Sequence, residues 1–225
     1  MIIVAVVDGR ANQKGTDKIM TASVFTPHIK IEHVISFSDA VFAFAITLMA
    51  LSIDIPDLPL DLTQSELLEK LYGIYPQFEN YLISFAVVAI FWISYHQVFN
   101  HIRGSHISMV YLNLLFLLLI TLLSLTTSLV INYGSYQIPY IIYCMVVIMA
   151  SSLLAAIWWY ATKEHQFVDK DMHPLFIRGT MFNLLSIPMI FSISIGISFA
   201  DLDIAQYFWL GIIPLNVLIR YKYKH

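Results

Sequence analysis

Long apolar stretches alternate with short polar ones along most of the chain. Only Asp39 and Asp54 are formally charged between residues 34 and 55, and at about 1.5 Å per residue a helix of this length crosses a hydrocarbon layer of about 30 Å. Similar apolar runs predict further spans. The pattern therefore predicts an all-α integral membrane protein with six transmembrane helices, the last five at about 80–99, 107–131, 138–161, 175–200 and 204–218.

Two segments outside the spans carry signals of their own. Thr26-Pro27 is a typical N-cap and first helical residue, which predicts that the first helix opens there. Between the first two spans, Leu67, Leu68 and Leu71 recur at helical spacing, so we expect a short amphipathic helix lying at the membrane surface. Residues 1–26 are expected to form a cytosolic N-terminal tail, and residues 27–225 the six-helix transmembrane domain.

Composition agrees with a membrane protein and narrows its chemistry. Hydrophobic residues make up 59% of the chain and charged residues 12%, whereas an ordinary soluble domain has about 25% charged residues. A single cysteine, Cys144, excludes an internal disulfide and a metal site built from several thiolates. The sequence contains neither a glycine-rich phosphate loop nor an HExxH motif, so it shows no sign of nucleotide-dependent or zinc-dependent catalysis.

The distribution of basic residues predicts the orientation in the membrane. With six spans and a cytoplasmic N-terminus, eleven of the twelve lysines and arginines fall on the cytoplasmic side and only Lys70 falls outside, as the positive-inside rule requires. Both termini are therefore predicted to be cytoplasmic. Acids on the opposite side would concentrate cations there. They are Asp54, Asp57, Asp61, Glu66, Glu69, Glu79, Asp201 and Asp203.

The first span presents two faces when it is drawn as a helix. One is a stripe of small residues that would let a second helix approach closely, and the adjoining face is a stripe of bulky apolar residues. Asp39 lies beside the small stripe and is expected to point at a neighbouring helix. We therefore predict a helix buried in protein on most sides, with the bulky stripe facing lipid, core or a pore. The small stripe is Ala40, Ala43, Thr47 and Ala50, and the bulky stripe is Phe37, Phe44, Leu48 and Leu51.

Polar side chains in the first three spans cluster toward the predicted cytoplasmic ends, so they can lie at one depth. A carboxylate inside a membrane needs donors, and a serine hydroxyl, an indole N–H, an imidazole and an amide can supply them to Asp39. Two interpretations remain open: a functional network that sets the helix angle or relays protons, and a polar clasp with no part in transport. The residues are Ser36, Ser38, Asp39, Ser84, Trp92, Ser94, His96 and Asn113.

Four histidines, His33, His96, His101 and His106, fall near the same predicted cytoplasmic level. Imidazoles could ligate a metal ion or a haem iron, but this spacing matches no known site. Histidines at membrane edges are mostly solvated or hydrogen-bonded. We therefore predict no metal site.

Three segments resemble one known family. The first-span sequence FSDAVFAFAITLMAL, with the motif Phe-Ser-Asp at 37–39, is similar to the first-helix signature of the transmembrane protein 175 family of potassium channels. The second span resembles that family through Phe91, Trp92 and His96, and the third through Asn113. The resemblance runs from about residue 31 to the end of the chain and is clearest over the first three spans.

The resemblance implies a single six-helix repeat that assembles as a homotetramer around its first helices, in the cell membrane of a prokaryote. Two positions depart from the family, because His33 replaces an arginine and Phe44 replaces an aliphatic residue. The implied pore constriction is Phe44, Thr47, Leu48 and Leu51. The implied signature network is His33, Phe37, Ser38, Asp39, Trp92, His96 and Asn113.

The sequence therefore favours a potassium-permeable cation channel with a hydrophobic constriction. Its expected partners are potassium ions and membrane lipid, with no catalytic residues, no cofactor and no nucleic acid. The main alternative is a proton-coupled transporter that uses Asp39, His33 and His96 as a relay. A second alternative is a membrane protein that holds haem or a metal ion.

Overall fold

The computed structural model describes residues 29–55, 59, 61–103, 107–163 and 167–209, and every regular element in this part of the chain is helical. Five of the described helices are long and apolar enough to cross a membrane. The helices are α1 (Ile31–Ala50), α2 (Gln64–Gly73), α3 (Tyr75–Phe99), α4 (Ile107–Tyr133), α5 (Gln137–Thr162), α6 (Pro174–Ser198) and α7 (Leu202–Phe208).

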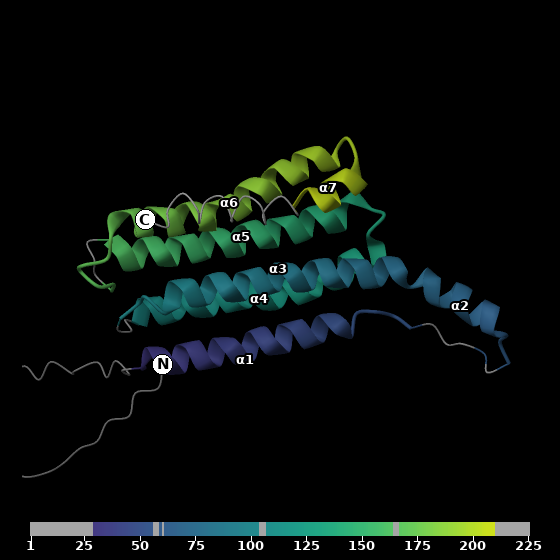
Figure 1. Ribbon diagram of the computed structural model, residues 1–225, viewed down its shortest axis with the longest axis horizontal. Coiled ribbons are helices and arrows are strands. Elements are labelled where there is room, and N and C mark those ends of the chain that lie inside the picture. The colour runs from purple at the N-terminus through teal and green to yellow at the C-terminus, as the bar shows by residue number, and fades with distance from the viewer. Residues whose placement is uncertain (1–28, 56–58, 60, 104–106, 164–166, 210–225) are drawn as a thin grey trace, which may run out of the picture.

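The long helices lie side by side in antiparallel order, so each returns the chain to the opposite end of the bundle (Figure 1). The helix α1 forms one side, α3 and α4 form the middle, and α5, α6 and α7 form the other side. We call the end that carries α2 the outer end and the opposite end the inner end, after the orientation that the charges predict. The helix α1 packs only on α3 and α4 among the described helices with substantial contacts.

The element boundaries agree with the predicted spans, with two differences. The helix α1 begins at Ile31, because Lys30 has an extended backbone and is the N-cap, so the predicted opening at Thr26-Pro27 is wrong. Those two residues, like the predicted tail at 1–26, lie outside the described part of the chain. The sixth span is predicted at 204–218, and the described chain includes only its beginning, α7.

The short amphipathic helix expected around Leu67, Leu68 and Leu71 is present as α2. Its start is fixed by a capping box, in which the Thr63 hydroxyl accepts from the Glu66 backbone N–H and the Glu66 carboxylate accepts from the Thr63 backbone N–H. The Thr63 hydroxyl also donates to Glu66 Oε2 at 2.7 Å. This hydrogen bond, together with the one from the Thr63 backbone N–H, lowers the pKa of Glu66, because both favour the charged carboxylate. No residue of α2 is buried, and the helix projects beyond α3 at the outer end (Figure 1).

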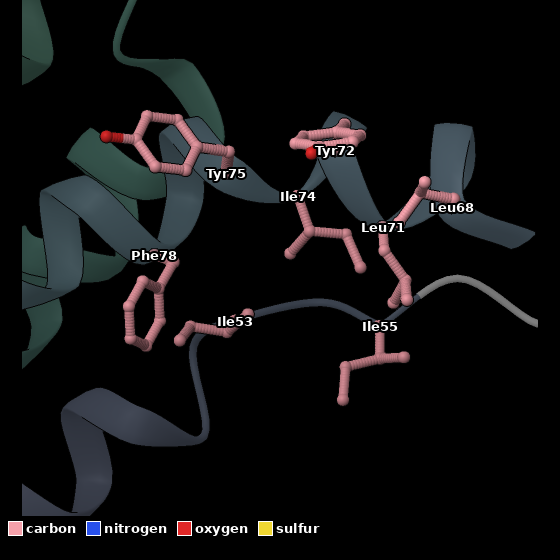
Figure 2. A pocket seen from close by; sticks show the side chains of 8 residues that line it. All are labelled: Ile53, Ile55, Leu68, Leu71, Tyr72, Ile74, Tyr75 and Phe78. Carbon is pink, nitrogen blue, oxygen red and sulfur yellow. The ribbon is translucent and has the colours of Figure 1, made fainter.

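An apolar groove lies at the outer end, between the segment that follows α1 and the corner where α2 meets α3. Figure 2 shows Ile53 and Ile55, on the segment that follows α1, beneath the side chains of that corner. The groove has a volume of about 600 Å³. A hydrogen bond of 3.1 Å from the Asp54 N–H to Gln77 Oε1 fixes the segment beside it. The remaining walls are Leu68, Leu71, Tyr72, Ile74, Tyr75 and Phe78.

At the inner end, two connecting segments are tied to each other. Arg103 donates to the Asp169 carboxylate at 2.7 Å, and the Arg103 backbone N–H donates to the Phe167 carbonyl. Both side chains of the ion pair are largely exposed, so the pair itself adds little stability. Its role is geometric, because it holds the segment after α3 against the segment after α5.

The predicted orientation can be tested with cysteines at exposed positions of the two ends. Ser65→Cys and Ser135→Cys lie at the outer end, and Lys170→Cys lies at the inner end. A membrane-impermeant maleimide applied to intact cells should label the first two variants and not the third, because basic residues are retained on the cytoplasmic side. Permeabilised cells, in which all three variants should react, provide the control. Labelling of Lys170→Cys in intact cells would overturn the orientation.

Candidate functional site

The carboxylate of Asp39 on α1 is held by two side chains of α3. Asp39 Oδ1 accepts a hydrogen bond of 2.9 Å from Trp92 Nε1 and lies 2.8 Å from His96 Nε2. Trp92 and His96 are one helical turn apart, so they reach the same carboxylate oxygen from one face of α3. The side chains of His96 and Asp39 are 24% and 43% exposed. The carboxylate is thus paired but not sealed from the subunit surface.

Ser38, the neighbour of Asp39, is the buried centre of a second set of hydrogen bonds. Its hydroxyl accepts from the Tyr95 hydroxyl at 2.8 Å and from Asn113 Nδ2 at 3.0 Å, and it donates to the Val34 carbonyl at 2.8 Å. A hydroxyl has one donor and two acceptor positions, so all of its hydrogen-bonding capacity is used. Ser38 therefore joins α1, α3 and α4 at one point.

Aromatic packing next to Ser38 stabilises the same contact between α1, α3 and α4. The Tyr95 ring stacks on Phe116 with centroids 5.8 Å apart, and the Phe42 ring lies 5.7 Å from Tyr95. Further along α1, toward the outer end, the Ser124 hydroxyl of α4 donates to the Ala45 carbonyl at 3.0 Å. The buried side of α1 is therefore fixed along most of its length by polar and aromatic contacts together.

The structure brings five of the predicted network residues together and leaves two apart. Phe37 is exposed, and the His33 side chain has no partner among the described residues. Tyr95 was not expected in the network, although its position three residues after Trp92 places it on the same face of α3. We define the polar clasp as Ser38, Asp39, Trp92, Tyr95, His96 and Asn113.

The bulky stripe lies on the side of α1 that faces away from the bundle. Phe44 is 62% exposed and Leu51 is 81% exposed, whereas Ala45 and Met49 on the opposite side are fully buried. The stripe also includes Phe37 and Leu48, which are exposed as well. Thr47, beside the stripe, is exposed, and its hydroxyl donates to the Phe44 carbonyl at 2.8 Å. The bulky stripe therefore has no partner within the described part of the subunit.

The small stripe is exposed too, which corrects one prediction. Ala40, Ala43, Thr47 and Ala50 are all exposed within the subunit, so no described helix of the same chain packs on them. In the most apolar stretch of α1 only 28% of the residues are buried, compared with 44–56% in the other four spans. The expectation that α1 is buried on most sides is wrong for the single subunit, because hydrogen bonds and large side chains, not small residues, decide which side packs.

The four histidines do not form a metal site in the described residues. No group of three or more metal-binding side chains occurs among them. His96 is bound to Asp39, and His101 Nδ1 is 2.8 Å from the Gln97 carbonyl, with its ring against Phe176. His106 lies outside the described residues. The haem or metal alternative therefore has no geometric support in this part of the chain.

The segment that contains these features is similar to known proteins. The family described as "Endosomal/lysosomal potassium channel TMEM175" matches residues 33–123, which contain the whole polar clasp and the bulky stripe. A potassium channel of Streptomyces collinus is 27% identical over 172 residues, which cover 74% of this chain and 81% of that protein. Over residues 33–123 the chain matches the TMEM175 family. The resemblance drawn from the first three spans is thus confirmed.

Other relatives match shorter parts of the chain. A potassium channel of Chamaesiphon minutus is 30% identical over 98 residues, 44% of this chain and 48% of that protein. The mouse TMEM175, named an endosomal/lysosomal proton channel, is 34% identical over 137 residues, 56% of this chain and 27% of the mouse protein. The match thus spans half or less of each of these two relatives. The relatives are ion channels rather than enzymes.

A solved structure confirms the fold of the subunit. The crystal structure of a lysosomal potassium-selective channel TMEM175 homologue from Chamaesiphon minutus matches with a TM-score of 0.69, over 87% of this chain and 98% of that chain, at 20% identity. The predicted all-helical architecture and the location in the membrane as a multi-pass protein are confirmed. The exposed side of α1 thus belongs to a subunit with the same fold as that channel.

Proposed function

We propose that this chain is the subunit of a homotetrameric, potassium-permeable channel in a prokaryotic cell membrane, and that the α1 helices line its pore. Each subunit contributes six spans, the sixth beginning with α7, and both termini are cytoplasmic. The constriction is formed by Phe44, Thr47, Leu48 and Leu51. Potassium is the proposed ion because the bacterial relatives are named potassium channels.

The exposed bulky stripe is the observation that carries this proposal. One side of α1 is fixed to α3 and α4 by the polar clasp, and the opposite side presents Phe44, Leu48 and Leu51 with nothing in the described subunit to cover them. Lipid could cover such a stripe, but lipid does not require that a helix be held at a set rotation. A hydrogen-bonded clasp that fixes this rotation is what a symmetric ring of side chains needs.

The apolar character of the stripe determines how such a pore would work. A ring of phenyl and isobutyl groups offers no oxygen ligands to replace the hydration shell of an ion, so selectivity depends on the width of the ring and on partial dehydration. Rings of this kind close by losing water. The outer end supplies acids such as Asp54 and Glu79, which would raise the local concentration of cations.

Proton transport is the alternative function, because the contact between Asp39 and His96 favours it. Asp39 and His96 lie 2.8 Å apart and are both partly exposed, so a proton could pass between a carboxylate and an imidazole there. The mammalian relatives are named proton channels. The two functions differ in what they transport, and both can be measured on the same purified protein.

Potassium flux into liposomes that contain the purified protein tests the proposal directly. A potassium gradient should drive uptake without a pH gradient, and the flux should not saturate in the millimolar range, with valinomycin defining the full response. A pH-sensitive dye inside the same vesicles reports protons. Saturable flux that requires a pH gradient would refute the channel and favour the transporter.

His33 gives a second test, since an imidazole exists in neutral and charged forms whereas a guanidinium is always charged. Potassium flux through the native protein should change when the pH is varied between about 5 and 8. His33→Arg should hold the flux at its low-pH value, and His33→Gln, which is uncharged at every pH, should hold it at its high-pH value. Liposome flux at fixed potassium gradients measures all three. A pH dependence that survives in both variants would show that His33 is not its source.

A further inference from the structure

A polar crevice opens at the outer end of the bundle, away from α1. It has a volume of about 450 Å³ and lies where α3, α4, α7 and the turn between α4 and α5 meet. Its polar lining is formed by Asn80, Asn132, Ser135, Asp203 and Gln206. We call it the outer crevice. A crevice of this size with polar walls can hold water.

A second, much smaller cavity lies deeper in the bundle beside the outer crevice. This inner cavity has a volume of about 20 Å³, whereas a single water molecule requires about 10 to 15 Å³ on the same kind of measure. Asn80 and Gln206 line both spaces, so their amide side chains stand between them. None of the residues that line the inner cavity belongs to α1.

Two buried polar groups at the inner cavity have no hydrogen-bond partner among the described residues. They are the hydroxyl of Tyr143, a residue that is 5% exposed, and Nε1 of Trp209, a residue that is 3% exposed. Both residues line the inner cavity. Ser84, which also lines the inner cavity, approaches the Tyr143 hydroxyl without completing a normal hydrogen bond. Buried polar groups are almost always satisfied by protein or by ordered water, so a ligand is expected here.

The chemistry of the two groups limits what that ligand is. An indole N–H is a donor only, so the ligand must offer an acceptor, which excludes a metal ion or potassium ion against Trp209. A tyrosine hydroxyl both donates and accepts, so the ligand can also be a donor. The volume admits one small molecule. We propose that the inner cavity of each subunit holds one ordered water molecule, which enters by the outer crevice and bridges Trp209 Nε1 to the Tyr143 hydroxyl.

This water completes the attachment of the last described helix. The Tyr140 hydroxyl on α5 donates to the Ala205 carbonyl of α7 at 2.7 Å, and Gln206 Nε2 donates to the Gly134 carbonyl at 3.4 Å. Trp209 follows directly on α7. The water therefore links the residue after α7 to α5, beside the direct hydrogen bond of Tyr140.

Hydroxyl-radical labelling by X-ray radiolysis of the full-length protein in nanodiscs tests the proposal, because bound water produces radicals next to the side chains it touches. Trp209 and Tyr143 should be labelled several-fold faster than side chains of equal burial without bound water. Trp158 and Tyr95 are the matched controls. Both are fully buried, and both are bonded to protein, Trp158 Nε1 to the Ile177 carbonyl and Tyr95 to Ser38. Equal labelling of all four residues would show that the cavity is dry and overturn the proposal.

A substitution distinguishes a bridging water from general access of solvent. Tyr143→Phe removes one of the two anchors, so the labelling of Trp209 should fall toward that of Trp158. Tyr136→Phe, which alters an exposed tyrosine at the same end, should leave the labelling of Trp209 unchanged. Undiminished labelling of Trp209 in Tyr143→Phe would show that no water is shared between the two side chains, and would refute the bridge.

Discussion

Phe44→Ala should increase the single-channel conductance of the proposed tetramer several-fold and reduce its preference for potassium over sodium. The Phe44 side chain is among the most exposed on α1 and lies on the stripe that the subunit leaves uncovered. Around a fourfold axis, four phenyl rings would form a tight and dry constriction. Methyl groups in their place leave a wide, wet ring through which an ion keeps its water, so partial dehydration no longer discriminates between ions.

Planar-bilayer recordings in potassium and sodium solutions measure both quantities. Leu51→Ala, which alters the same stripe nearer the outer end, should change them less. Leu125→Ala on α4 removes an exposed leucine that is not on the bulky stripe and should change neither. If Phe44→Ala has no effect while Leu48→Ala alters the conductance and the preference for potassium, then the side of α1 that faces the pore is centred on Leu48 and not on Phe44.

Asp39→Ala should lower the yield of assembled tetramer and reduce flux in proportion. The change removes the acceptor of Trp92 Nε1 and the partner of His96. Unsatisfied donors cost about 1 to 3 kcal/mol when they are buried, and the partial exposure of this site places the expected loss at the lower end. Without the pair, α1 loses some of the contacts that fix its rotation, so the ring of bulky side chains is held less precisely.

Size-exclusion chromatography of the purified protein and a thermal unfolding curve measure the effect of Asp39→Ala. Asp39→Asn keeps one acceptor oxygen of the same size, so it should lose less than the alanine variant. Asp54→Ala, which alters an exposed acid just beyond α1, should assemble normally. Tetramer yield and flux that stay normal in Asp39→Ala would show that the polar clasp neither positions α1 nor carries protons.

The helices and most of the polar clasp could be predicted from the sequence for one physical reason. A polar side chain inside an apolar helix must find a partner, and few candidates exist at the right depth, so the amino-acid sequence was enough to select Asp39, Trp92, His96 and Asn113. Tyr95 was missed because a tyrosine in an apolar run is usually interpreted as packing. Only the position of its hydroxyl, against Ser38, reveals its second role.

The rotation of α1 could not be predicted in full. The small stripe matched the usual signature of close helix packing, yet its alanines are exposed in the subunit. The side that packs contains Phe42 and Met49, because aromatic packing on Tyr95 and the hydrogen bonds of Ser38 together outweigh the benefit of a closer approach. Sequence periodicity identifies the faces of a helix, but which face meets the neighbouring helices depends on contacts between distant residues.

The separation in sequence between Asp39 and its partners has a consequence for biosynthesis. Trp92 follows Asp39 by 53 residues, which at about 5 to 20 residues per second takes the ribosome about 3 to 10 seconds. During this time the indole and imidazole that hold the Asp39 carboxylate have not been synthesised. An acid at the centre of an inserted helix costs about 2.5 to 3.5 kcal/mol on translocon scales. Stable insertion of α1 is therefore expected to depend on the arrival of α3, which supplies the partners of Asp39.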